Sequence, residues 1–325
     1  MIELNEANLT GYLLERGWVA SPDGVTVSAL GWGVSNAVFR VATPDGLFVV
    51  KQSRPQLRTR DAWFSDIDRV WREMEVMQIL HPLLPAGIVP EVLNCDRDNY
   101  AFAMEHAPEP SRVWKEDLLR GEIDAPLAEA VGRILGRIHE TTAASPDLVA
   151  PFADRTVFVQ LRVDPFYRRI QQRLPDVAGA VEPLIESMMQ SREALCHGDY
   201  SPKNILTHAA GFTLVDYETA HQGDPAMDLG FCASHLVLKS LRTNADRSAM
   251  RDLVTRFWRS HAAEVRSLPD LEARGVAHLG LCLLARIDGT SPVDYLDEPA
   301  RLMARALGRL ILLDPRRTLA EALQM

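Results

Sequence analysis

The sequence lacks the patterns that mark several common protein classes. Its four cysteines, Cys95, Cys196, Cys232 and Cys282, form no Cys-x-x-Cys pair and no zinc-like spacing. No apolar run approaches the roughly 20 residues needed to cross a bilayer. Residues 1–6 also lack the basic and apolar stretches of a secretory signal. We therefore expect a cytoplasmic protein with reduced cysteines and no membrane partner.

Positive charge is scarce too, with 35 Lys and Arg residues against 44 Asp and Glu residues and a formal net charge of −9. Nucleic-acid-binding domains normally carry a basic stripe, and the chain has no long one. We expect no nucleic-acid partner. A nucleotide site is compatible with this charge, because it needs only local positive charge and a metal ion.

The length of 325 residues suggests two domains of roughly 150 residues each. Residues 67–77 carry apolar side chains at helical spacing, and a second helical stripe covers 127–138. Segments with strand patterns are 37–41, 47–51, 91–93, 100–104 and parts of 196–216. We expect an α+β, bilobal fold with a mostly β N-terminal lobe (1–106) and a mostly α C-terminal lobe (107–325).

The strongest chemical signal is the run from His197-Gly198-Asp199 to Asn204, on a loop before a strand pattern. Transfer of a phosphoryl group to a hydroxyl needs an acid that accepts or orients the hydroxyl proton. It also needs a neutral oxygen donor for magnesium nearby. Asp199 and Asn204 offer both groups, although the His-Gly-Asp triplet alone is a weak signal.

A second acidic motif follows, where a strand pattern over 212–215 ends in Asp216-Tyr217-Glu218. Strand alternation puts the two carboxylates on one side, and magnesium prefers one or two carboxylates plus substrate phosphates. The spacing from Asn204 suits a tight hairpin that turns at 209–211. An exposed acidic strand end is common by itself, but both motifs at this spacing favour a metal site.

These motifs resemble those of the aminoglycoside phosphotransferase and choline kinase superfamily, a branch of the protein-kinase-like fold. The resemblance implies that Asp199 is the catalytic acid/base and that Asn204 and Asp216 hold the metal. It implies Glu218 as a further metal contact, direct or through water.

The segment 223–229 also resembles the run that follows the metal motif in this family. By that resemblance, Asp224 and Asp228 would brace the catalytic loop. The alternative is N-capping of a helix before Leu229, and for Asp224 the two interpretations have about equal weight.

The N-terminal lobe carries weaker candidates for a phosphate site. The glycine-containing segment 30–36 precedes a strand, and we expect Gly33, Ser35 and Asn36 to lie near phosphate oxygens, because exposed backbone N–H groups can cradle them. Asn36 stands where protein kinases have a third glycine. The chain contains no Gly-Lys-Ser/Thr run and therefore no P-loop.

Lys51 ends the next strand pattern, where kinase-like folds place a lysine that pairs with phosphates and with a helix glutamate. Glu73 is the expected partner because its helical neighbours are apolar, and a buried carboxylate without a cation is costly. Glu75 has polar neighbours and is the second choice. The resemblance further suggests that backbone groups of Met104 and His106 meet the adenine.

The acceptor side is less determined. Arg162, Arg286 and Asp288 could touch a substrate, but surface salt-bridging is the simpler interpretation of each. An aminoglycoside acceptor would need an acidic cluster, for which Asp288, Asp294 and Asp297 are the candidates. Trp258 is expected in the core, and we expect structural roles for His139 and His197.

Together these features predict a small-molecule kinase that transfers the γ-phosphoryl group of ATP or GTP, with Mg²⁺, to a hydroxyl of a sugar, aminoglycoside or amino-alcohol. A nucleotide-binding pseudokinase scaffold is the alternative, disfavoured because Lys51, Asp199, Asn204 and Asp216 are all present. Protein phosphorylation is disfavoured because no Ala-Pro-Glu run follows Asp216.

Overall fold

The computed structural model of the chain describes residues 1–31, 36–54, 65–314 and 318–323. The chain divides into two units. Unit 1 consists of Met1–Pro110 and Thr213–Glu218, and unit 2 consists of Ser111–Phe212 and Thr219–Met325. The acidic motif that ends at Glu218 therefore packs with the N-terminal residues of the chain.

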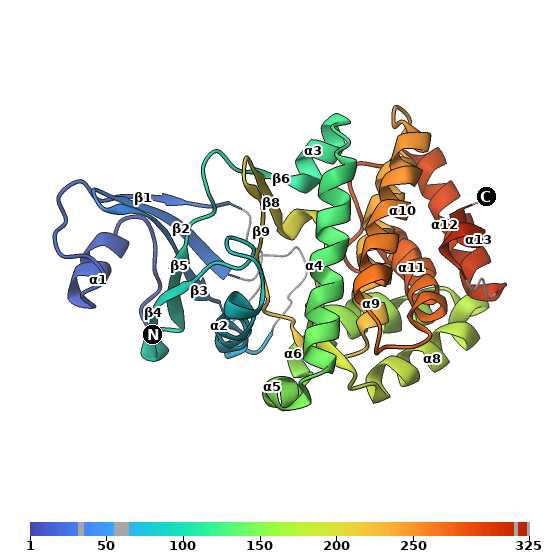
Figure 1. Cartoon of the computed structure of the whole chain (residues 1–325), viewed down its shortest axis with the longest axis horizontal. Coiled ribbons are helices and arrows are strands. Elements are labelled where there is room, and N and C mark those ends of the chain that lie inside the picture. Colours follow the sequence, from blue (N-terminus) through green and yellow to red (C-terminus); the bar gives the residue numbers. More distant parts are fainter. Residues whose placement is uncertain (32–35, 55–64, 315–317, 324–325) are drawn as a thin grey trace. The chain divides into compact units, whose positions relative to one another are not determined.

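Unit 1 is built on a five-stranded antiparallel sheet in the order β1-β2-β3-β5-β4 (Figure 1). Its strands are β1 (Thr26–Ala29), β2 (Asn36–Thr43), β3 (Gly46–Ser53), β4 (Val92–Asp96) and β5 (Ala101–Glu105). The β2–β3 connection is tight, since Thr43 pairs with Gly46, and its Asp45-Gly46 pair is typical of hairpin turns. Helix α1 (Leu9–Glu15) and the sheet share a core that includes Leu9 and Phe39.

Helix α2 (Arg69–Leu80) contacts β3, β4 and β5 of the same unit. Its apolar side chains, among them Val70, Met74 and Met77, are buried as the helical spacing predicts. The face that carries these side chains also carries buried polar residues, which belong to the candidate active site.

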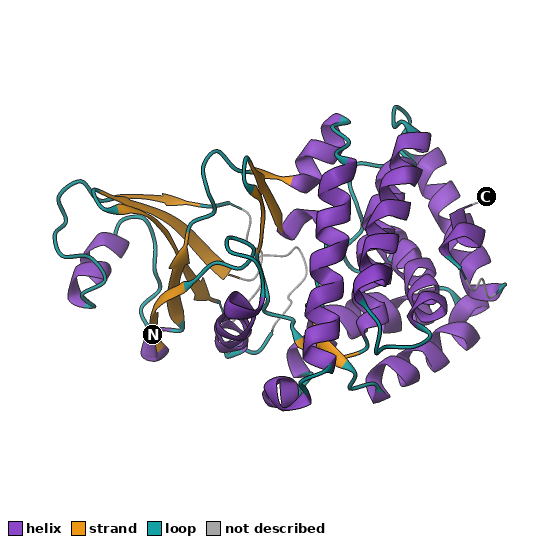
Figure 2. Ribbon diagram, viewed as in Figure 1, coloured by secondary structure: helices purple, strands orange, loops and turns teal. Residues whose placement is uncertain are grey.

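Unit 2 is largely helical (Figure 2). Its helices are α3 (Trp114–Arg120), α4 (Ala125–Ala143), α5 (Pro146–Val149), α6 (Thr156–Phe158), the π-helical η4 (Val159–Arg168), α7 (Arg169–Arg173), α8 (Pro175–Gln190), α9 (Pro225–Ser240), α10 (Arg247–Glu264), α11 (Leu271–Asp288), α12 (Glu298–Leu313) and α13 (Leu319–Leu323). Asp124 caps α4, because its side chain accepts a hydrogen bond from the Leu127 N–H at 2.9 Å.

The helices of unit 2 pack as pairs, chiefly α4 with α10, α9 with α11, and α11 with α12. Gly132 permits the first pair, since a Cβ there would lie 2.1 Å from the carbonyl oxygen of Phe257. Trp258 is buried, as expected. No described helix combines the length and the apolarity that crossing a membrane requires.

Short strands flank the loop 197–204, the predicted catalytic loop. Strand β7 (Ala194–Cys196) leads into it and pairs with β10 (His221–Gly223). Strand β8 (Ile205–His208) leads out of it, pairs with β6 (Arg112–Val113) and is followed by β9 (Gly211–Leu214). The predicted α+β class, with a mostly β first part and a mostly α second part, is confirmed.

Candidate active site

A buried charge cluster in unit 1 centres on Lys51. Its ammonium nitrogen Nζ lies 2.6 Å from Oε2 of Glu73 and 2.8 Å from Oδ1 of Asp216. Lys51 is 4% exposed and Glu73 is 1% exposed. Burial alone would lower the pKa of Lys51, but the carboxylates of Asp216 and Glu73 outweigh burial and raise it. The ammonium group is therefore a fixed positive charge.

The expected pairing of Lys51 with Glu73 is confirmed as a contact. Burial raises the pKa of the Glu73 carboxyl, and the Lys51 ammonium opposes that rise. Glu75 instead meets Arg97 at 3.4 Å, with both side chains largely exposed. Apolar neighbours on a helix thus distinguish the buried carboxylate from the exposed one.

Asp216 reaches Lys51 from an unusual backbone conformation. Its φ angle is +72°, in the left-handed region that non-glycine residues avoid. That region costs an L-residue roughly 1–2 kcal/mol, and such strain gathers at functional sites. The turn comes directly after β9, and it directs the carboxylate to the ammonium group of Lys51.

Glu218, the second acid of the motif, is bound to two other side chains of unit 1. Its Oε2 accepts hydrogen bonds from Nδ2 of Asn36 at 2.8 Å and from Nε of Arg69 at 3.1 Å. The sequence analysis did not single out Arg69, which is 1% exposed. Its position four residues before Glu73, on the same helix face, is a signal that could have found it.

The remaining predicted nucleotide contacts are Gly33, Ser35, Met104 and His106. Gly33 and Ser35 lie outside the described residues. Met104 is near the end of β5, and His106 follows it. The Nδ1 atom of His106 is 2.6 Å from the carbonyl oxygen of Ala107. The structure brings Asn36, Lys51, Glu73, Asp216 and Glu218 together, and their roles toward a nucleotide stay predictions.

In unit 2, Asp199 is the centre of a second polar cluster and is 3% exposed. Its Oδ2 atom lies 2.7 Å from Nη2 of Arg162 and 2.6 Å from Nζ of Lys203. It also accepts a hydrogen bond from Nδ2 of Asn204 at 3.0 Å. Arg162 therefore pairs with the predicted catalytic acid rather than with a surface partner, which corrects the simpler interpretation.

Asp228 braces the catalytic loop, as the resemblance implies. This fully buried carboxylate accepts the backbone N–H of His197 at 2.6 Å and that of Gly198 at 2.8 Å. Burial would raise its pKa, but hydrogen bonding to His139 and to the loop N–H lowers it. Gly198 has φ +75°, and a Cβ there would meet the carbonyl oxygen of Thr219 at 2.6 Å. The loop thus requires both this glycine and this acid.

Asp224, by contrast, caps α9, which was its alternative interpretation. Its Oδ1 atom accepts the Ala226 N–H at 3.0 Å and lies 3.2 Å from Nη1 of Arg274. Arg274 also pairs with Glu193 at 2.6 and 2.7 Å.

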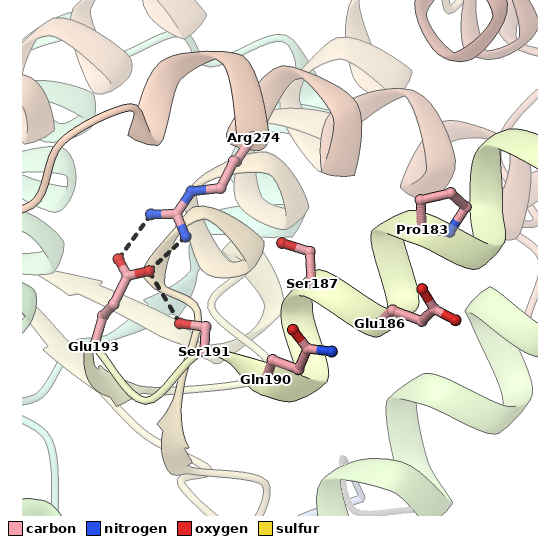
Figure 3. A pocket seen from close by; sticks show the side chains of 7 residues that line it. All are labelled: Pro183, Glu186, Ser187, Gln190, Ser191, Glu193 and Arg274. Carbon is pink, nitrogen blue, oxygen red and sulfur yellow. Dashed lines mark hydrogen bonds and ion pairs between the residues drawn. The ribbon is translucent and has the colours of Figure 1, made fainter.

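A surface depression opens beside that pair (Figure 3). Its lining residues are Pro183, Glu186, Ser187, Gln190, Ser191, Glu193 and Arg274. None of them belongs to the catalytic loop, so this depression is not the candidate active site.

Replacing Asp228 by Asn is expected to lower the free energy of unfolding by about 2–3 kcal/mol, because one of the two loop N–H groups then faces an NH₂ group. Urea denaturation monitored by circular dichroism measures the change. Asp252→Asn, at an exposed position of α10, is the matched control and should stay within about 0.5 kcal/mol. Equal stability of the two variants would contradict the bracing role.

Comparison with known proteins now identifies the family. A family model described as the phosphotransferase enzyme family matches residues 26–265. The chain belongs to this family. The family resemblance of the catalytic and acidic motifs is thereby confirmed.

Relatives within the family have low sequence identity to this chain. Methylthioribose kinase 2 of Oryza sativa subsp. japonica is 25% identical over 268 residues, which cover 72% of this chain and 62% of the rice protein. The methylthioribose kinase of Bacillus cereus (strain AH187) is 23% identical over 354 residues, covering 93% of this chain and 88% of that protein.

A solved structure of a choline/ethanolamine kinase family protein from Mesorhizobium loti covers 98% of this chain and 99% of that chain, with a TM-score of 0.59 and 20% identity. At this identity the likeness concerns the fold. It agrees with the predicted kinase-like architecture of this member of the phosphotransferase enzyme family.

Proposed function

We propose that this member of the phosphotransferase enzyme family transfers the γ-phosphoryl group of ATP to a hydroxyl group of a small molecule. One observation carries the proposal, namely the contact of the Lys51 ammonium with both Glu73 and Asp216. A lysine so held is the phosphate-binding lysine of kinase-like proteins. The relatives named methylthioribose kinase support a small-molecule acceptor.

Unit 1 binds the nucleotide in this proposal. Lys51 neutralises phosphate charge, and Glu73 holds its side chain in place. Asn36 lies near the phosphate oxygens in this proposal, and the same prediction stands for Gly33 and Ser35, which are outside the described residues. Backbone groups of Met104 and His106 meet the base. Arg69 and Asn36 both donate hydrogen bonds to Glu218. Arg69 thereby helps to hold Glu218 and Asn36 in position.

Asp199 acts on the acceptor. Its carboxylate orients the hydroxyl group for in-line attack on the γ-phosphorus, where a new O–P bond forms as the bond to the β–γ bridging oxygen breaks and ADP leaves. The hydroxyl proton passes to Asp199 late, because phosphoryl transfer is largely dissociative and asks mainly for positioning. Arg162 and Lys203 hold the carboxylate in place.

The proposed donors, an amide oxygen and two carboxylates, are of the kinds that magnesium prefers. Asn204 uses its amide nitrogen on Asp199, which leaves its amide oxygen for a hard cation, and the Asp216 side chain is 25% exposed. Asn204 and Asp216 are the proposed ligands, with Glu218 as a further contact, direct or through water. A magnesium ion held by these residues would supply positive charge against the phosphates.

The names of the relatives support a proposal for the class of acceptor. The names of the relatives favour a sugar over an aminoglycoside or amino-alcohol. Because the match covers only 62% of the rice protein, the activity and substrate of this chain stay proposals. We also propose that it works in the cytoplasm without nucleic-acid partners.

An ADP-release assay with Mg²⁺ and a panel of hydroxyl compounds tests this function, with ATP and GTP compared as donors. We expect turnover of at least one sugar-like compound and a phosphate ester in the mass spectrum of the product. Nucleotide binding without consumption by any compound would contradict catalysis and support the pseudokinase alternative.

A further inference from the structure

Basic side chains gather near His235 in unit 2. The chain has only four lysines in 325 residues, and three of them, Lys115, Lys203 and Lys239, are close enough to His235 to lower its pKa, together with Arg286. Desolvation is the largest cause of that lowering. Lysines are thus concentrated in one place although the chain as a whole is acidic.

Two aromatic rings connect these cations. The ammonium groups of Lys115 and Lys239 lie 6.0 and 5.3 Å from the ring centre of Tyr295. The guanidinium carbons of Arg162 and Arg286 each lie 5.8 Å from the ring centre of Phe166. Because Arg162 also contacts Asp199, the cations reach from the catalytic carboxylate into the helices of unit 2. We call Lys115, Arg162, Lys203, Lys239 and Arg286 the cationic cluster.

Lys239 is the least expected member of the cationic cluster. It is 2% exposed, and its Nζ atom donates to the carbonyl oxygen of His235, one turn earlier in α9, at 3.1 Å. No carboxylate of the described residues forms an ion pair with it. Burial, reinforced by the charge of Lys115, lowers the pKa of Lys239 to about 7. An amine buried without an anion destabilises the protein, which suggests that a ligand supplies the anion.

Three other buried donors of unit 2 are unsatisfied within the part of the chain that the structure describes. Nε of Arg286, the hydroxyl group of Tyr295 and the hydroxyl group of Ser201 are buried, and none hydrogen-bonds to a described residue. Buried donors are usually satisfied, so several unsatisfied ones together call for an explanation. An acceptor-rich ligand next to Asp199 would satisfy them.

Nearby acids do not supply the missing negative charge. Asp288 pairs with Arg305 at 2.9 Å. Asp297 caps α12 by accepting the Ala300 N–H at 2.9 Å, and Asp294 is exposed. The acidic cluster that an aminoglycoside acceptor would need is therefore not formed by Asp288 and Asp297.

We propose that the acceptor carries, besides its hydroxyl group, an anionic group that Lys239, Arg286 and Tyr295 bind, with Arg162 and Lys203 close to the hydroxyl group at Asp199. A carboxylate and a phosphate share this chemistry. The inference rests on the proposed function and narrows its substrate. It disfavours aminoglycosides and amino-alcohols, whose ammonium groups the cationic cluster would repel.

A matched panel tests the substrate class. Sugar acids, sugar phosphates, neutral sugars and amino sugars of similar size are compared by kcat/KM in the ADP-release assay. We expect the kcat/KM of an anionic compound to exceed that of its neutral analogue by at least tenfold. Comparing the sugar acids with the sugar phosphates shows whether the site prefers a carboxylate or a phosphate. Equal or better use of neutral or amino sugars would overturn the inference.

Titration calorimetry separates the two proposals. An anionic compound that binds but is never phosphorylated supports the inference. It contradicts only the proposed kinase function. If no anionic compound in the panel binds or is turned over, the inference is overturned.

The variant Lys239→Met tests the contact itself. Its KM for the anionic acceptor should rise at least tenfold, with kcat and the KM for ATP changed far less and the use of neutral analogues unchanged. Its melting temperature should not fall, because the substitution removes a buried amine that has no carboxylate partner among the described residues. Arg259→Met, at an exposed position of α10, is the control and should leave every constant unchanged.

Arg286→Met provides a second variant should Lys239→Met fold poorly. It should also raise the KM for the anionic acceptor selectively. An unchanged KM for that acceptor in both variants, or a rise in the KM for ATP instead, would overturn the proposal, since the cationic cluster would then serve structure or the nucleotide.

Discussion

Replacing Asp199 by Ala is expected to lower kcat by at least about 10²–10⁴-fold, the contribution of a positioned acid/base, while ATP still binds. The reason is geometric. Three groups, from Arg162, Lys203 and Asn204, hold Oδ2 of Asp199, so its carboxylate has a defined place for an incoming hydroxyl group. Steady-state kinetics measure kcat, and a nucleotide-binding titration measures the affinity for ATP.

Two further variants make this result specific. Asp199→Asn keeps the shape of the side chain but removes the proton acceptor, so it should be nearly as inactive. Asp164→Ala, at an exposed residue of η4 that pairs with Arg168, should behave like the unmodified protein. Near-normal turnover of Asp199→Ala would refute its assignment as the catalytic residue.

The substitution Lys51→Met should have the largest effect on stability, together with a loss of activity. It leaves Glu73 and Asp216 without their shared cation, and breaking a buried pair in this way costs about 3–5 kcal/mol. Urea denaturation measures the loss. The kcat/KM for ATP should fall in parallel, because the phosphate-binding charge is gone.

A double variant separates the two roles of Lys51. Adding Glu73→Leu to Lys51→Met removes the uncompensated buried carboxylate, so much of the lost stability should return. Activity should not return, since no ammonium group is present for the phosphates. Recovery of activity along with stability would show that Lys51 has only a structural role.

The sequence predicts interactions best where they are local or where spacing is diagnostic. Asp199 and Asn204 share one loop, and the apolar neighbours of Glu73 indicate a buried carboxylate that needs Lys51. The left-handed conformation of Asp216 is not visible in the sequence, because no glycine or turn signal marks it. Arg69 could have been found from its helix face but was not.

The cationic cluster could not be predicted from local pattern. Lys115 lies on α3, Lys239 on α9 and Arg286 on α11, and only the packing of unit 2 brings them near Tyr295. Each lysine or arginine considered alone is most simply a surface residue. The buried amine of Lys239, which forms no ion pair with a described residue, distinguishes this cluster from solvated charges.

The central proposal is that Asn204 and Asp216 are ligands of the metal ion that phosphoryl transfer requires. The most direct measurement is the affinity for Mn²⁺ in the presence of a non-hydrolysable ATP analogue. Electron paramagnetic resonance detects the bound and free Mn²⁺. It compares the unmodified protein with Asn204→Ala, Asp216→Asn and the double variant. We predict a marked loss in each single variant and a non-additive loss in the double variant. Additive losses, or an unchanged affinity in either single variant, would contradict the shared metal site.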